Sequence, residues 1–238
     1  MLGLSVKTNL LPKLAALQER LGLSEAELKK VVVRYPLVLS LSMQANVLPS
    51  FAAMQKRLGL SEVELKKLVV RQPRVLGYSI GSNVLPSLAV LQEVLGLSEA
   101  ELKKIVLKRP TMLGLSIEAN LFPFLATLQE RLELSQAELK QVVLRHPPVL
   151  GYSMEANVGP KLDWLQKEMQ LNLGALRQRV VANPTVLGYS LDQRYRPRLM
   201  ACSTARVPVI TVLDLIGIPD SSFYPAIGID INDQDVHA

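Results

Sequence analysis

The chain has 238 residues, of which 49% are hydrophobic and 20% charged, a composition that is ordinary for a globular protein. A single cysteine excludes a disulfide framework and a cysteine-based zinc site, and two histidines exclude a histidine-rich metal cluster. No apolar run reaches the roughly 18–20 residues that a membrane span requires. We therefore expect no metal, no cofactor and no membrane partner.

The formal net charge of +6 conceals an asymmetry along the chain. All 27 lysines and arginines lie at or before Arg206, together with 16 of the 21 acidic residues, so this part carries +11. The remainder, 207–238, carries −5. A basic body with an acidic tail favours a polyanionic partner for the body.

A period of 37 residues runs through the sequence. It appears in two columns of proline and one of serine: Pro12, Pro49, Pro86, Pro123, Pro160 and Pro197; Pro36, Pro73, Pro110, Pro147 and Pro184; Ser5, Ser42, Ser79, Ser116, Ser153 and Ser190. A fixed period between about 20 and 50 residues is typical of a solenoid. No segment alternates with period two, so we predict an all-α helical-repeat solenoid.

The repeat contains a capped helix that a proline ends. Ser61 and Glu64 have the spacing of a capping box, in which each side chain accepts from the other residue's backbone N–H. Apolar residues then follow at helical spacing, namely Leu65, Leu68 and Val69. Pro73 disfavours the α conformation at the residue before it, so the helix should end near Arg71.

A short corner leads to the other helix of the repeat. The segment 73–79 is too short for a strand, and we expect a helical turn closed by Gly77. The next helix should begin near 83–85, with a bent turn extending it back toward Ser79, because proline suits a first turn. Gly96 is the expected left-handed stop.

Both ends of the array depart from the repeat. The first five residues align with 38–42, so the chain opens in mid-repeat, which we interpret as a truncated or processed first unit. The period ends after about Arg198, and we divide the chain into a repeat array, 1–198, and a C-terminal cap with acidic tail, 199–238. The segment 211–218 could supply a closing helix, and residues from about Ile229 look frayed.

Basic side chains recur in three columns. The first is Lys29, Lys66, Lys103, Lys140 and Arg177; the second is Lys30, Lys67 and Lys104; the third is Arg34, Arg71, Lys108 and Arg145. Acids at the start of a helix and bases toward its end are favoured by the helix dipole, which accounts for single lysines. A polyanion-binding surface is the other interpretation, and it fits the third column together with the net charge best.

Catalysis finds little support in the sequence. A serine that recurs at every corner is a cap rather than a nucleophile, and no corner has the spacing of a phosphate-binding loop. His146 occupies a variable surface position, Cys202 is expected to pack, and Trp164 falls at a core position. We predict that the protein is not an enzyme.

The repeat resembles that of the mitochondrial transcription termination factor (mTERF) family. The resemblance is carried by the corner 73–79, the N-x-x-P-x-L-x-x-L segment 83–91, the capped L-G-L-S-x-x-E-L segment 95–102 and the pre-proline base at Lys108. It covers about 1–198, including an ending similar to the family's last repeat.

The resemblance implies a left-handed superhelix of three-helix units that binds nucleic acid, most often double-stranded DNA. It also implies a monomer that acts in mitochondria or chloroplasts, on transcription termination or another step of transcription regulation. The implied contacts are the third column and, near the end, Arg194, Arg196 and Arg198, with the first column as further candidates. No arginine-rich transit segment precedes the first repeat, so the organelle rests on the resemblance alone.

Two alternatives stay open at this stage. Some members of the family act on RNA, so intron splicing or rRNA maturation is one. The other is a protein-interaction scaffold, the common use of α-solenoids.

Overall fold

The computed structural model describes residues 10–116 and 120–230, and its regular structure within these ranges is helical, with no strand. The α-helices are α1 Leu11–Leu21, α2 Glu25–Arg34, α3 Leu48–Leu58, α4 Glu62–Arg71, α5 Leu85–Leu95, α6 Glu99–Lys108, α7 Phe122–Arg131, α8 Gln136–Arg145, α9 Gly159–Glu168, α10 Leu173–Ala182, α11 Arg196–Thr204, α12 Thr211–Asp214 and α13 Asp220–Ala226. The predicted all-α repeat fold is confirmed. The residues that open the chain in mid-repeat lie outside the described ranges.

The predicted helix boundaries follow from local chemistry. The Ser61 side chain accepts from the backbone N–H of Glu64, and the Glu64 side chain accepts from the backbone N–H of Ser61, which is the predicted capping box. The same box opens α2, α6 and α8. Helix α4 ends at Arg71, as the following proline predicted. The apolar stripe of α4 is buried, with Leu65 fully inaccessible.

The corner and the bent turn are also confirmed. Pro73–Gly77 forms a 3₁₀ turn, and Ile80–Val84 forms a π-helical turn that continues directly into α5. The proline of α5 therefore sits in the first turn of the α-helix, where a missing N–H costs little. Gly96 ends α5 with φ 58°, a left-handed conformation that favours glycine.

Three corner glycines lie directly against a tyrosine of the preceding repeat. These pairs are Tyr35–Gly77, Tyr78–Gly114 and Tyr152–Gly188. In every pair, a Cβ atom on the glycine would collide with the tyrosine hydroxyl. The glycine is therefore needed for close approach of the neighbouring side chain and not for a positive φ.

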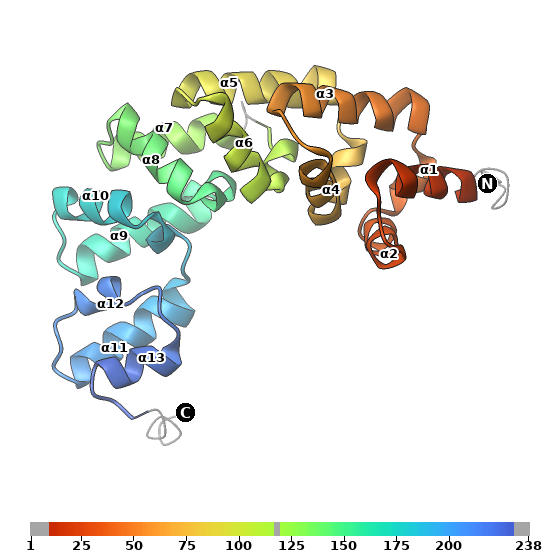
Figure 1. Ribbon diagram of the computed structural model, residues 1–238. Helices are drawn as coiled ribbons and strands as arrows, with labels where there is room; N and C mark the ends of the chain where they lie inside the picture. Colours follow the sequence, from red (N-terminus) through yellow and green to blue (C-terminus); the bar gives the residue numbers. More distant parts are fainter. Residues whose placement is uncertain (1–9, 117–119, 231–238) are drawn as a thin grey trace. The chain divides into compact units, whose positions relative to one another are not determined.

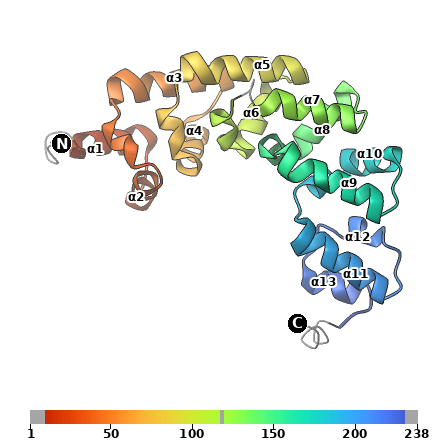
Figure 2. The same cartoon turned by 180° about the vertical axis from the view of Figure 1, so that it is seen from behind.

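The chain forms two compact units, Met1–Phe122 and Pro123–Ala238. In the first unit, α1, α3 and α5 form one row and α2, α4 and α6 a second row (Figures 1 and 2). Buried leucines of both rows, including Leu68 of α4 and Leu91 of α5, build the core of this unit. Stacking neighbouring repeats thus completes a core that one helix pair could not bury alone.

The second unit contains the remaining helices and the C-terminal cap. Trp164 is buried as predicted, and its ring centroid lies 5.7 Å from that of Tyr195. The expected closing helix is only four residues long, α12, and α13 follows it. The boundary that we predicted after Arg198 falls inside α11. The end of the acidic tail, 231–238, lies outside the described residues.

Over the described ranges, no single helix is long and apolar enough to cross a membrane. Only the bent pair Ile80–Leu95 and Glu99–Lys108, with 117° between its members, meets the length and composition requirement jointly.

Candidate nucleic-acid interface

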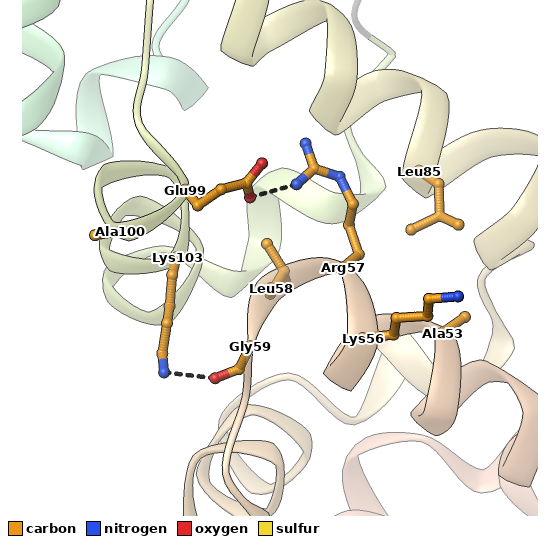
Figure 3. A pocket seen from close by; sticks show the side chains of 9 residues that line it. All are labelled: Ala53, Lys56, Arg57, Leu58, Gly59, Leu85, Glu99, Ala100 and Lys103. Carbon is orange, nitrogen blue, oxygen red and sulfur yellow. Dashed lines mark hydrogen bonds and ion pairs between the residues drawn. The ribbon is translucent and has the colours of Figure 1, made fainter.

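The first basic column connects neighbouring repeats. The ammonium group of Lys103 donates to the carbonyl oxygen of Gly59, the left-handed cap of α3, over 2.7 Å (Figure 3). It also lies 2.7 Å from Oε2 of Glu64, the capping-box carboxylate of the preceding repeat. Lys66 makes the equivalent two contacts one repeat earlier. These lysines cap one helix and pair with the start of the next, so their charge is used inside the protein.

The other members of the first column differ from one another in exposure and in their contacts. In the second unit, Arg177 donates through Nη2 and Nε to the two carboxylate oxygens of Glu138, at 2.6 and 3.0 Å. This hydrogen-bonded pair lowers the pKa of Glu138 to about 2. Lys140 is half-buried on α8, whereas Lys29 on α2 is exposed. Lys29 forms no hydrogen bond or ion pair with any residue that the structure describes.

A second set of ion pairs joins the repeats of the first unit. Arg57 of α3 lies 2.5 Å from Glu99 at the start of α6 (Figure 3). Arg20 forms the same pair with Glu62 one repeat earlier, also at 2.5 Å. The hydrogen bond from Arg20 lowers the pKa of Glu62. These arginines are therefore structural as well.

The third column, the predicted pre-proline contacts, divides into two kinds. The guanidinium of Arg71 donates to the carbonyl oxygens of Leu107 and Lys108, at 2.7 and 3.2 Å. These carbonyls end the second helix of the next repeat, so Arg71 caps that helix. The side chains of Arg34 and Lys108 are exposed and make no hydrogen bond or ion pair within 10–116 and 120–230.

Arg145 behaves as Arg71 does, in the second unit. Its Nη1 donates to the carbonyl oxygens of Val181 and Ala182, at 3.1 and 2.7 Å. With the amide of Gln141 turned so that its oxygen faces Arg145, the remaining nitrogens donate to that oxygen at 2.8 and 3.2 Å. The guanidinium of Arg145 is thus fully engaged by the protein.

The second column is the exposed one, and our sequence-based list of contacts left it out. Lys30, Lys67 and Lys104 are exposed on α2, α4 and α6, and none is paired with another described residue. Each lies four residues before the third column, hence on the same helix face. That spacing was the available signal. We had instead assigned these lysines to the helix dipole.

The C-terminal arginines hold the cap in place. Arg198 is 1% exposed, and it donates to the carbonyl oxygens of Leu215 and Ile218, at 2.7 and 2.6 Å, and to a carboxylate of α13. Arg194 is half-buried and donates to the same Ile218 carbonyl at 2.7 Å. Arg196 is exposed and pairs with a neighbouring aspartate at 3.0 Å. Because Arg198 is buried, it cannot make the nucleic-acid contact that was predicted for it.

Cations at one repeat position, Lys13, Lys161 and Arg198, donate to backbone carbonyl oxygens, and the first two were not among the predicted residues. Lys161 is 2% exposed, and its ammonium donates to the carbonyl oxygen of Leu187 over 2.6 Å. Burial lowers the pKa of Lys161 to about 8. Lys13 makes the same contact with Leu39, and Arg198 occupies the equivalent place at the end of the array. The signal was the residue after the repeated proline, which is basic in these three repeats.

The other polar residues that the sequence singled out make local contacts or are buried. His146 is half-buried and its Nε2 lies 2.7 Å from the hydroxyl of Tyr152, a contact that Gln72 makes with Tyr78 two repeats earlier. Cys202 is fully buried, which raises the pKa of its thiol. In the part of the chain that the structure describes, no group of three or more histidines, cysteines and carboxylates could hold a metal ion.

The comparison with protein families decides what these repeats are. The mTERF family model matches residues 1–95 and 50–224, two overlapping segments that together cover nearly all of the chain. The chain belongs to the mTERF family. Among curated proteins, none matches it.

Membership of the mTERF family agrees with the geometry of the described repeats. The family consists of helical-repeat proteins that bind nucleic acid and regulate organellar gene expression, and its members are typically organellar. The protein is therefore a nucleic-acid-binding regulator of this class. Lys30, Lys67 and Lys104 are among the exposed bases that have no partner in the described residues.

Proposed function

We propose that this mTERF protein binds double-stranded DNA through the exposed face of α2, α4 and α6. The binding residues are Lys30, Arg34, Lys67, Lys104 and Lys108, which we call the basic face. The protein would act without catalysis as a regulator of transcription, in particular of termination, in a mitochondrion or plastid. The observation that carries the proposal is that these five charges are exposed and unpaired, whereas Lys66 and Lys103 of the first column are engaged by the preceding repeat.

Electrostatics explains how this face would hold DNA. Duplex DNA carries about one negative charge per 1.7 Å of axis, and each neutralised phosphate releases counterions. No acid occupies the second or third column, so nothing within those columns cancels their charge. Five free bases would give a log–log salt slope of magnitude about 4 to 5, from the factor of about 0.9 per phosphate.

The test compares two pairs of exposed lysines. K67A/K104A removes two charges from the basic face, and K56A/K167A removes two exposed lysines that lie outside it. Fluorescence anisotropy with a duplex of about 25 base pairs would be measured between about 50 and 200 mM salt. We expect K67A/K104A to bind at least tenfold more weakly, with a salt slope smaller by about two, and K56A/K167A to bind as the unchanged protein does.

Four results would contradict the proposal. If the two variants lost DNA affinity equally, only the net charge of the protein would matter. If the DNA affinity did not change with salt concentration, phosphate contacts would be excluded. Tighter binding of a folded RNA than of matched duplex DNA in direct competition would assign the basic face to RNA. Unchanged nucleic-acid binding after charge reversal of Lys67 and Lys104 would favour a protein-interaction scaffold.

A further inference from the structure

Apart from Arg34, the basic face offers only lysines and aliphatic side chains. Two aliphatic columns lie beside its charges on α2, α4 and α6: Ala26, Val63 and Ala100, and Val33, Val70 and Leu107. Val33 and Val63 are 68% and 60% exposed. Direct readout of base edges by hydrogen bonds uses donors and acceptors in fixed pairs, chiefly from Arg, Lys, Asn, Gln and carboxylates. Aliphatic side chains at these positions supply none.

The charged groups of this face are also poor readers of base sequence. Four of the five are lysines, which are point charges on flexible stems and suit phosphates. Arg71 lies in the third column, but both of its terminal nitrogens donate to carbonyl oxygens of α6, so its planar fork is directed at the protein. Arg34 is the one unengaged guanidinium in these columns over the described part of α2, α4 and α6.

Near-identity of the repeats adds a second argument. The segments EAELKKVVVR, EVELKKLVVR and EAELKKIVLK form α2, α4 and α6, and each begins with the same capping box. A polyanion moved along the face by one repeat would again meet a free lysine of the second column at the same helix position, whereas the third column has a free base on α2 and α6 and an engaged arginine on α4. For the second column, registers that differ by one repeat are therefore equivalent.

We propose that the basic face binds the phosphodiester backbone independently of base sequence and in several equivalent registers. This inference rests on the proposed function, because it concerns the partner of the same face. Affinity comes from charge and counterion release, and discrimination between sequences is small. A sequence-specific complex loses affinity at each mismatched base pair, and Arg34 is the one guanidinium of this face that is free to make such a difference.

The test uses the full chain and a pool of duplexes of about 25 base pairs with a randomised interior, at a salt concentration near physiological. Bound and unbound duplexes are separated and sequenced. We expect the two fractions to have the same composition, with no motif enriched more than about threefold. A motif enriched at least tenfold, the equivalent of about 1.4 kcal/mol, would overturn the inference.

R34K provides the matched control for the one free guanidinium. Lysine keeps the charge but lacks the rigid planar fork that arginine offers to guanine. We expect R34K to leave the composition of the bound fraction unchanged, whatever its effect on the overall affinity. A motif that is enriched by the unchanged protein and lost in R34K would refute sequence independence while leaving DNA binding intact. Failure to bind any duplex in the pool would instead refute the proposed function, and the inference with it.

Discussion

The adjacent residues Lys103 and Lys104 allow the structural and binding roles to be separated by single substitutions. K103A removes one ammonium group that lies 2.7 Å from both the Gly59 carbonyl and the Glu64 carboxylate. K104A removes an exposed ammonium group that has no partner in the described residues. The two variants have the same net charge, so long-range electrostatic effects are matched.

The expected cost of K103A can be worked out from the two contacts. An ion pair near the surface contributes about 0.2–1 kcal/mol, and the side chains of Lys103 and Glu64 are 28% and 29% exposed, which places this pair toward the upper end. A cation at a helix C-terminus adds about 0.3–1 kcal/mol. We expect K103A to lower the free energy of unfolding by about 1–2 kcal/mol, and K104A to change it by less than about 0.5 kcal/mol.

For both variants, the free energy of unfolding would be measured by urea denaturation followed by circular dichroism, and the affinity for duplex DNA by fluorescence anisotropy. K103A should lose stability and, at a temperature where it is folded, keep its DNA affinity within about twofold. K104A should show the reverse, with affinity reduced severalfold because one phosphate contact is lost. If K104A were destabilised as much as K103A, or if K103A lost more affinity than K104A, the assignment of the two columns would be wrong.

Three further outcomes follow from the contacts between repeats and at the cap. G114A should lower the free energy of unfolding, measured by heat or urea, by about 1–3 kcal/mol, because the added Cβ would collide with the ring of Tyr78. Adding Y78L to G114A should restore much of the lost stability, because it removes the ring. The pKa of Glu138 is lower in the folded protein, about 2, than in the unfolded chain, near 4.5, so ionised Glu138 stabilises the fold above pH 4.5 and this stabilisation is lost as the pH falls toward about 2. In acid unfolding followed by circular dichroism, E138Q should lack this part of the pH dependence. R198M should make 211–230 more susceptible to limited proteolysis, because the substitution leaves the carbonyl oxygens of Leu215 and Ile218 without their buried donor. Digestion at the same rate as the unchanged protein would contradict this prediction.

Much of the fold could be predicted because its signals are local. A serine–glutamate box, a proline after the last turn and a glycine with positive φ each act within a few residues of backbone, so α4 ends at Arg71 and α5 at Leu95 as expected. The 37-residue repetition then implied stacking, because single helix pairs cannot bury their apolar faces. The length of α12 was overestimated, since no repeat informs the C-terminal region.

The candidate site was harder to predict because it depends on what each side chain meets across repeats. Lys103 and Lys104 are chemically identical neighbours, and the one that reaches the preceding repeat is set by the packing of α6 against α3. In the same way, Arg71 hydrogen-bonds to a carbonyl oxygen at the end of α6, and Arg198 hydrogen-bonds to a carboxylate of α13. Sequence alone established the helices, their period and the columns of charge. The tertiary structure decided which charges are used inside the protein, because only the packed neighbours supply the carbonyl and carboxylate oxygens that engage them.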